Sequence, residues 1–349
     1  MLSRQYLTST TIFIVTILCC YSGDGAYSNG ASHTKYDLSE QYLEEQFENL
    51  TDPGLYNRHV RPPSKGPTKV FTSLNIVSIN AISSQYLQLN VILLISHAWL
   101  DLRLNYHNQT KYFDDDSLCL EGTKWHLDRV WWPSLFLLNE QQGRLMNIID
   151  DNLYISVCPH GNIYYQYRIQ ETLHCSMDLS RFPFDTQMCK IELGSWRYSN
   201  NSVVLDWDSD YIPVTGDVIV VNEFKLNRFK FRKELRQDLG RGSRSYSVLV
   251  VELYLDRQWG YYFIQYYVTS FILVFISWIS LWLDQAAAPA RVTLGTSTLL
   301  TFVTLSSNSK AVLPKVSVIT VIDSWYFICM LFIVATLLEY ALVNITYRR

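Results

Sequence analysis

The chain has 349 residues, 29 Lys and Arg against 32 Asp and Glu, and an aromatic content of 14%. This length allows one large domain or two ordinary ones, and the net charge of −3 lacks the basic excess typical of a nucleic-acid-binding protein. Polar and apolar residues mix as far as Gln258, whereas the segment after Trp259 is almost continuously hydrophobic, which predicts a domain boundary there.

Residues 1–25 have the pattern of a secretory signal peptide. Arg4 provides the positive start, Thr11 to Cys20 the apolar stretch, and 22–26 the small residues suited to cleavage. Roughly ten or twelve apolar residues are too few for an anchoring helix, which is the alternative. Three glycosylation sequons fit an exported domain, and they begin at Asn49, Asn108 and Asn200.

Residues 26–258 predict an extracellular all-β immunoglobulin-like sandwich preceded by a helix. Leu38 to Leu50 has apolar residues at helical spacing, and Asp52-Pro-Gly54 stops it. Short segments rich in Val, Ile and Tyr alternate apolar and polar residues, as half-buried strands do. The expected strand regions are 70–96, 99–106, 153–157, 163–173, 190–195, 217–231 and 246–255.

Nothing in this half predicts an enzyme or a cofactor. It contains no metalloprotease helix, no phosphate-binding glycine loop and no nucleophile elbow. Of seven cysteines, two lie in the signal and Cys329 lies in an apolar segment. The remaining four lie in the exported region, where disulfides persist, and they allow three pairings of two bridges. They are Cys119, Cys158, Cys175 and Cys189.

Residues 259–349 predict a membrane domain with three helices, at about 261–283, 291–309 and 317–343. The first two are uncharged between Tyr261 and Leu283 and between Val292 and Ser309, and the third carries only two acidic residues near its ends. After an exported N-terminal domain, three crossings place the C-terminal arginines in the cytosol, which agrees with the positive-inside rule.

The second membrane helix carries hydroxyl groups along one face. Thr293, Ser297, Leu300 and Thr304 recur at i, i+4, i+7 and i+11. Such a stripe can serve as hydrogen-bonding glue between packed helices, or it can line water. The basic flanks at Arg291 and Lys310 favour a pore, in which Leu300 would form a hydrophobic ring that closes by dewetting.

The charges around this helix predict an anion pore. A ring of Arg291 side chains, reinforced by the helix N-termini, would favour anions over cations. No acidic residue lies between Gln285 and Lys310.

Two segments carry a resemblance to a known family. CSMDLSRFPFDTQMC, from Cys175 to Cys189, resembles the signature loop of the Cys-loop receptors, with its tip Phe182-Pro183-x-Asp185. PARVTLGTSTLLTFVTLSS, from Pro289 to Ser307, resembles the pore segment of that family's chloride-conducting branch. Cation-conducting relatives usually lack this proline and carry an acidic residue near Ala290. The likeness covers residues 38–349.

The resemblance implies a pentamer in the plasma membrane, with an extracellular N-terminus and agonist sites between neighbouring extracellular domains. An aromatic cluster on the principal face could hold a cation over its rings, although sandwich core is the alternative. The implied principal-face residues are Phe136, Trp196 and Tyr246, and the neighbouring face would offer Leu94, Ser96 and Gln166.

Departures from the family pattern argue against an amino-acid agonist. Relatives that bind amino acids usually have an aromatic residue at Leu94, a carboxylate-binding arginine at Ser96 and an acidic residue at Gly194. Further departures that affect gating lie at Ser84, Ser134 and Thr269.

The pore tract and the unusual agonist site are most similar to arthropod chloride channels sensitive to pH or zinc. The agonist expected is a proton, zinc or an amine. Histidine titrates near neutral pH, although a lone histidine is more often a surface or core residue. The candidates are His97, His107, His160 and His174. No close pair has zinc-ligand spacing, so no metal site is predicted.

The family's topology also implies a second disulfide between Cys119 and Cys158, at the end of the sandwich far from the membrane. For coupling, it implies that the signature-loop tip, residues 83–86 and Arg257 meet the linker 308–314, which includes Lys310. The family has a long cytosolic loop and a fourth membrane helix, whereas this sequence stops after the third. The alternative to a conducting subunit is therefore one that assembles with full-length partners and suppresses them.

Overall fold

The computed structural model describes residues 33–107, 119–146, 152–195, 197–208, 220–221, 223–237, 244–284, 287–311 and 319–348. The chain divides into two units, residues 1–49 and 50–349. Helix α2 (His33–Leu50) accounts for the described part of the first unit and confirms the helix predicted before Asp52. The predicted signal peptide and the sequon at Asn108 lie outside the described residues.

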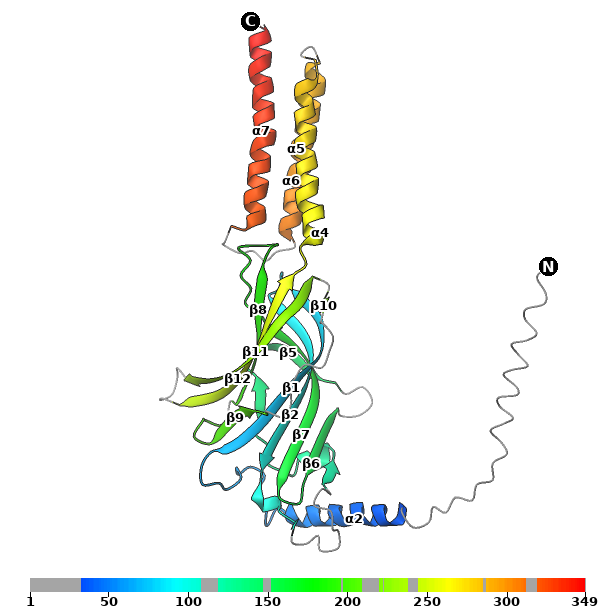
Figure 1. Ribbon diagram of the computed structural model, residues 1–349, viewed down its shortest axis with the longest axis vertical. Coiled ribbons are helices and arrows are strands. Elements are labelled where there is room, and N and C mark those ends of the chain that lie inside the picture. The colour runs from blue at the N-terminus through cyan, green and yellow to red at the C-terminus, as the bar shows by residue number, and fades with distance from the viewer. Residues whose placement is uncertain are drawn as a thin grey trace, which may run out of the picture. The chain divides into compact units, whose positions relative to one another are not determined.

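The second unit contains a β-sandwich and a helical part (Figure 1). Among the described residues, one sheet has the order β3-β6-β7-β2-β1-β9, with β5 also paired to β7, and the other has the order β10-β11-β12-β8-β4. Neighbouring strands are antiparallel except for β1 and β9. The first sheet contains β1 (Thr68–Ser83), β2 (Gln88–Leu100), β3 (Leu120–Gly122), β5 (Glu140–Leu145), β6 (Leu153–Val157), β7 (Asn162–His174) and β9 (Val203–Trp207). The second contains β4 (Leu135–Leu137), β8 (Thr186–Ser195), β10 (Val220–Val221), β11 (Phe224–Gln237) and β12 (Ser245–Arg257).

Alternating side chains build the sandwich core. In β2, Leu89, Val91, Leu93 and Ile95 are fully buried, and the residues between them are half-buried. Every residue from Val248 to Leu253 in β12 is buried, which places this strand in the middle of its sheet. The alternation read from the sequence therefore reflects two packed layers, and the sandwich prediction is confirmed.

The predicted strand at 99–106 is wrong beyond Leu100. The chain turns there into the 3₁₀-helix η1 (Leu102–Leu104). The buried Asp101 carboxylate accepts hydrogen bonds from the Arg103 backbone N–H at 3.0 Å and from the Tyr56 hydroxyl at 2.9 Å. These local bonds compete with a strand ladder, and apolar spacing alone does not reveal them.

The other strand predictions differ mainly at their ends. The region 70–96 forms two strands, β1 and β2, and the region 217–231 begins with the short β10 before β11 runs on to Gln237. The short strands β3, β4, β5 and β9 were not predicted, because three to six residues carry too little periodicity.

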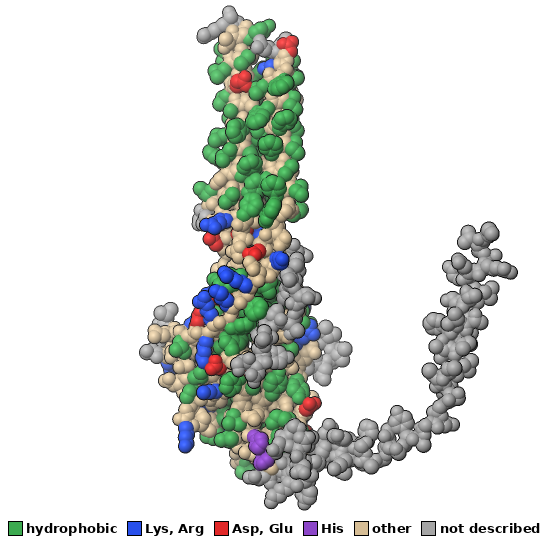
Figure 2. Space-filling model, viewed as in Figure 1, with side chains coloured by type: hydrophobic (Ala, Val, Ile, Leu, Met, Phe, Trp, Pro, Cys, Tyr) green, Lys and Arg blue, Asp and Glu red, His purple; other side chains and the backbone are tan. Residues whose placement is uncertain are grey.

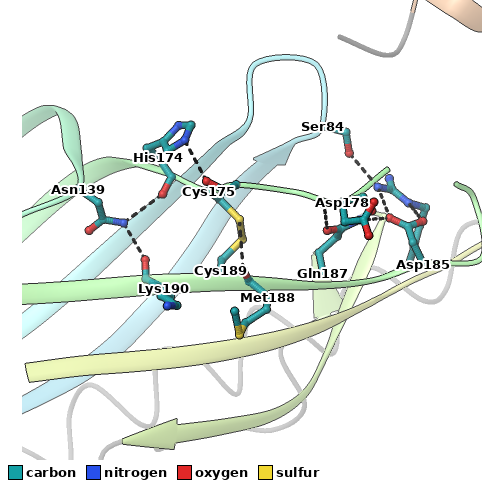
Figure 3. The surroundings of a disulfide bond; sticks show 12 residues. Ser84, Asn139, His174, Cys175, Asp178, Asp185, Gln187, Met188, Cys189 and Lys190 are labelled. Carbon is teal, nitrogen blue, oxygen red and sulfur yellow. Dashed lines mark hydrogen bonds and ion pairs between the residues drawn. A yellow bond between two sulfur atoms is a disulfide. The ribbon is translucent and has the colours of Figure 1, made fainter. Parts of the chain in front are cut away.

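Both expected disulfides are present, Cys175–Cys189 and Cys119–Cys158. Around the first, the Asn139 side-chain amide donates to the carbonyl oxygens of His174 at 3.0 Å and Lys190 at 2.8 Å (Figure 3). These bonds fix both ends of the signature loop to the body of the sandwich.

The helical part begins directly after β12. Its elements are α4 (Gly260–Tyr262), the π-helical η3 (Phe263–Val268), α5 (Thr269–Ile279), the 3₁₀-helix η4 (Ser280–Trp282), α6 (Ala288–Ala311) and α7 (Val321–Arg348). Gly260–Trp282 and Val321–Tyr347 are long and apolar enough to cross a membrane. Helix α6 is less apolar because nine of its 24 residues are Ser or Thr. On the face shown in Figure 2, hydrophobic side chains cover this helical part, whereas most charged ones lie over the strands.

The three long helical segments pack against one another. Gly295 allows the close approach of α6 to α7, because a Cβ atom at this position would lie 2.4 Å from Leu337 Cδ2. The Trp325 indole donates to Ser270 Oγ at 2.8 Å and joins α7 to α5.

Candidate functional site

The tip of the signature loop contacts the helical part directly. Phe182 is buried, and its ring packs edge-on against Tyr262 of α4 with 5.0 Å between centroids. Pro183 beside it is also buried, after a cis peptide bond. The Val321 N–H at the start of α7 donates to the Ser180 carbonyl at 3.2 Å. The tip therefore contacts both the first and the last of the helical segments.

Arg257, the last residue of β12, is the polar centre of this junction. Its side chain is completely buried, and it pairs with Asp185 through Nε–Oδ1 at 2.7 Å and Nη2–Oδ2 at 3.1 Å. Nη2 also donates to Ser84 Oγ at 3.0 Å, and Nη1 lies 3.4 Å from a Glu223 carboxylate oxygen. This bidentate pair joins the signature loop, the β1–β2 turn and the final strand in one network (Figure 3 labels Asp185 and Ser84).

Aromatic rings enclose the same guanidinium. It lies 4.4 Å from the centroid of Phe224, 4.8 Å from Phe182 and 5.9 Å from Tyr262. Since these rings exclude water, the ion pair is of the buried kind, in which the loss of one partner is costly. The resemblance implied that Arg257 and the loop tip meet the linker 308–314, and it indicated neither their contacts with one another nor those with Phe224 and Glu223.

Lys310 belongs to the linker predicted to meet the signature loop, and that contact stays a prediction. It lies at the end of α6 with an exposed side chain and pairs with Asp323 of α7 at 3.3 Å. Residues 312–314 of the predicted linker contact lie outside the described residues.

Helix α6 exposes its hydroxyl stripe. Thr293, Ser297 and Thr304 are exposed, and Leu300 between them is 67% exposed. The opposite side of the helix is buried through Gly295, Thr298 and other residues that pack against its neighbours. The interhelical-glue alternative therefore does not apply within one chain, because the stripe faces away from α5 and α7.

Arg291 does not share this exposed side. Its guanidinium is buried, donates to the Leu283 carbonyl and lies 6.0 Å from the centroid of Tyr340. Two helical residues correspond to about 200° of rotation, so a stripe that begins at Thr293 leaves Arg291 on the far side. The expectation of an exposed ring of Arg291 side chains is corrected accordingly. Pro289 and Ala290 are exposed at the start of the helix.

The predicted agonist residues form two separate groups. Phe136 in β4 pairs with Gly194 in β8, and Gly194 also pairs with Val248, two residues after Tyr246 in β12. Phe136 and Tyr246, both half-buried, therefore belong to one end of one sheet. Trp196 lies outside the described residues.

The second group belongs to the other sheet. Ser96 and Gln166 are directly paired across β2 and β7, and the Gln166 amide donates to Ser96 Oγ at 3.1 Å. Leu94 lies two residues away in β2, so it points to the same side of the sheet. Ser96 is buried, whereas Leu94 and Gln166 are half-buried.

The structure removes one of the four histidines predicted to titrate near neutral pH. His97 is buried between Thr72 Oγ1 at 3.1 Å and the Tyr167 hydroxyl at 3.3 Å, and burial lowers the pKa of His97 to about 3. It therefore remains neutral near physiological pH and is removed from the candidates. His174 is exposed and bonds to Gln141 and Ser176.

Glu171 is a titratable group that the sequence analysis missed. It is a buried residue in β7, and its Oε2 has no hydrogen-bond partner among the described residues. Burial, together with the nearby charge of Glu140, raises the pKa of Glu171 to about 7. A single acidic residue inside a strand gives no signal of this in the sequence.

Of the remaining sequons, Asn49 is exposed and Asn200 is half-buried. No group of three or more His, Cys, Asp or Glu residues able to hold a metal occurs in the part of the chain that the structure describes.

Comparison with protein families gives two matches that together cover most of the chain. Residues 43–259 match the neurotransmitter-gated ion-channel ligand binding domain, and residues 266–349 match the neurotransmitter-gated ion-channel transmembrane region. The chain therefore belongs to the neurotransmitter-gated ion-channel family, the Cys-loop receptors.

Membership in this family defines the class of protein. It is a subunit of a ligand-gated ion channel, and its family is pentameric, embedded in the plasma membrane by several helices and equipped with an extracellular ligand-binding domain. The family consists of receptors and channels, not enzymes.

Proposed function

We propose that this subunit contributes to a chloride-selective pore lined by α6 and opened by an agonist that binds between neighbouring extracellular domains. The observation that carries the proposal is the exposed stripe of Thr293, Ser297, Leu300 and Thr304, on the side of α6 turned away from α5 and α7. Five such stripes around an axis give a polar path with one hydrophobic ring at Leu300.

Positive charge at the start of this helix supports anion selectivity. Arg291 lies in the first turn of α6, where the helix dipole adds positive potential, whereas the charge of Lys310 in the last turn is offset by its pair with Asp323. A buried guanidinium close to a pore attracts anions through its electric field without touching them, because its low-dielectric surroundings screen the charge weakly.

The agonist proposed is a proton, zinc or an amine and not an amino acid. In support, the Ser96 hydroxyl already accepts a hydrogen bond from Gln166, and neither residue can bind a carboxylate as an arginine would. Half-buried Phe136 and Tyr246 offer ring faces, and this favours an amine among the three.

Voltage clamp of cells that express the chain tests selectivity and agonist together. Acid and alkaline steps, zinc and a panel of amines are applied, and extracellular chloride is then replaced by gluconate. We expect the reversal potential to follow the chloride gradient. A reversal potential that follows sodium instead would refute the anion pore.

Leu300→Thr tests the position of the gate. A threonine ring would be wetted more easily, so we expect spontaneous current or roughly tenfold higher agonist sensitivity. Leu299→Thr, one residue away on the half-buried side of α6, is the matched control and should not raise spontaneous current. If both variants gate like the wild type, Leu300 is not the gate.

A further inference from the structure

We propose that His107 and His160 form a binding site for a divalent transition-metal ion, such as Zn²⁺ or Cu²⁺, beside the Cys119–Cys158 disulfide. Their imidazole rings lie with centroids 4.4 Å apart and planes inclined by 31°. The two residues are 53 positions apart in the chain, so no local motif announces the pair. The geometry of the pair indicates this site whichever agonist opens the channel.

The backbone holds the two histidines together. His107 follows η1, and His160 lies in the turn between β6 and β7. The Tyr106 and His107 N–H groups both donate to the Pro159 carbonyl at 3.0 Å, and the Tyr106 hydroxyl donates to the Val157 carbonyl at 2.9 Å. Side chains attached to two segments bonded in this way are preorganised to act as ligands.

The β6–β7 turn is itself fixed from both sides. Cys158, two residues before His160, is tied to Cys119. Gly161, directly after it, has φ +81°, and a Cβ atom there would lie 2.4 Å from the Asp101 carbonyl oxygen. The Asp101 N–H also donates to the Gly161 carbonyl at 2.8 Å. The position of His160 is therefore determined by contacts that do not involve its imidazole.

The chemistry of the pair suits late first-row transition metals. Zinc binds imidazole nitrogen at about 2.0–2.1 Å, and two imidazoles on one tetrahedral ion have centroids roughly 5 Å apart. The observed separation of 4.4 Å is close to this value. Imidazole favours Cu²⁺ and Zn²⁺ over Mg²⁺ and Ca²⁺, which prefer oxygen ligands.

The solvent exposure of the two histidines and the number of ligands they supply indicate a metal site of moderate affinity. His160 is exposed and His107 is half-buried, so an ion reaches the pair from solvent. In the described part of the chain no third His, Cys, Asp or Glu joins them, and water would complete the coordination. Bound metal would join the segment after η1 to the β6–β7 turn and stabilise this end of the sandwich.

Chemical modification of the purified chain in detergent tests the site. Diethyl pyrocarbonate is applied with and without ZnCl₂, and each histidine is followed by peptide mass spectrometry. We expect zinc to slow the modification of His107 and His160 by roughly fivefold or more. Exposed His59 and His174 should be unaffected, and MgCl₂ should protect none of the four. Equal protection of His59, or no protection of the pair, would overturn the proposal.

His160→Gln provides the decisive variant. Removal of one ligand should abolish zinc protection of His107, whereas the matched control His59→Gln should leave it intact. Peptide mapping under non-reducing conditions checks that the Cys119–Cys158 disulfide persists in both variants. Zinc protection of His107 that survives in His160→Gln would refute a shared ion.

A second measurement covers the case in which the variant does not fold. Electron paramagnetic resonance of the wild-type chain with one equivalent of Cu²⁺ should show hyperfine coupling to two imidazole nitrogens. A spectrum with oxygen ligands alone would contradict the site.

Discussion

Two buried aspartate–arginine pairs lie at opposite ends of strand β2, and they have different consequences for the fold. Asp101, directly after β2, pairs with Arg103 at 2.7 Å, and Asp185 pairs with Arg257 beside the turn that precedes β2. Both carboxylates are buried, but Arg103 remains 20% exposed, whereas Arg257 is completely buried.

The first pair is local and the second spans the domain. Asp101 and Arg103 are two residues apart and shape a single turn, which the Tyr56 hydroxyl joins from an earlier segment. Asp185 and Arg257 are 72 residues apart, and their network also includes Ser84 of the β1–β2 turn. A local pair sets the shape of a loop, whereas a long-range pair makes several elements move together. The second arrangement is the one that suits transmission between an agonist site and a pore.

Removing the guanidinium from each pair in turn should show how much each pair contributes to stability, and we expect the larger loss at Arg257. Arg257→Gln leaves the Asp185 carboxylate buried without its partner, and we expect a loss of about 3–5 kcal/mol in the free energy of unfolding. Surface biotinylation and thermal unfolding in detergent should show little folded protein. Retention of wild-type stability would mean that water reaches this junction.

Arg103→Gln is the matched change at the other end of β2. Asp101 would still accept hydrogen bonds from the Tyr56 hydroxyl and from the backbone N–H of residue 103, and the lost guanidinium was partly exposed. We therefore expect a smaller loss of about 1–2 kcal/mol, measured by the same thermal unfolding. If Arg103→Gln destabilised the chain as much as Arg257→Gln, the local and the long-range pair would not differ in their contribution to stability.

Glu171 extends the comparison to a buried carboxylate without a guanidinium. Its pKa of about 7 lies above the ordinary value of 4.5, so the folded state binds the proton more tightly than the unfolded state. The stability that this carboxyl contributes is complete below about pH 4.5 and is lost as the pH rises through about 7.

Glu171→Gln should remove this pH dependence. The variant should match the wild type near pH 4 and exceed it by roughly 1–2 kcal/mol at pH 8, as measured by thermal unfolding across that range. Glu140→Gln removes the second cause of the shift and should move the wild-type transition to lower pH. Parallel pH profiles for Glu171→Gln and the wild type would show that the carboxyl is hydrated.

The sequence patterns predicted those parts of the fold that depend on repeated spacing. Alternation located β2, β7 and β12, and hydrophobic length located the segment 260–282 and α7. The resemblance supplied both disulfide pairings, whereas it placed Asp185 and Arg257 against the linker 308–314 and not against each other. The spacing along α6 also predicted its exposed stripe, whereas the burial of Arg291 depends on its contacts with Leu283 and Tyr340, which the spacing does not show.

What the sequence could not predict depends on contacts between distant segments. The rings around Arg257 come from three separate elements, and the imidazoles of His107 and His160 approach only because two turns are bonded together. The neutral state of His97 follows from its burial, which the residue's identity does not reveal. In each case the chemistry of a side chain is set by its neighbours in space.

The smallest expected effect concerns the hydroxyl that attaches the β1–β2 turn to the Arg257 network. Ser84→Ala removes one acceptor of Arg257 Nη2 at 3.0 Å but leaves both bonds to Asp185. We expect a loss of about 1 kcal/mol in unfolding free energy. Ser83→Ala is the control, because the bond that the Ser83 hydroxyl accepts from the Tyr86 N–H at 3.2 Å is exposed, and its loss should cost less. If Ser84→Ala destabilises the chain as much as Arg257→Gln, the β1–β2 turn, and not the Asp185 carboxylate, is the main partner of the buried guanidinium.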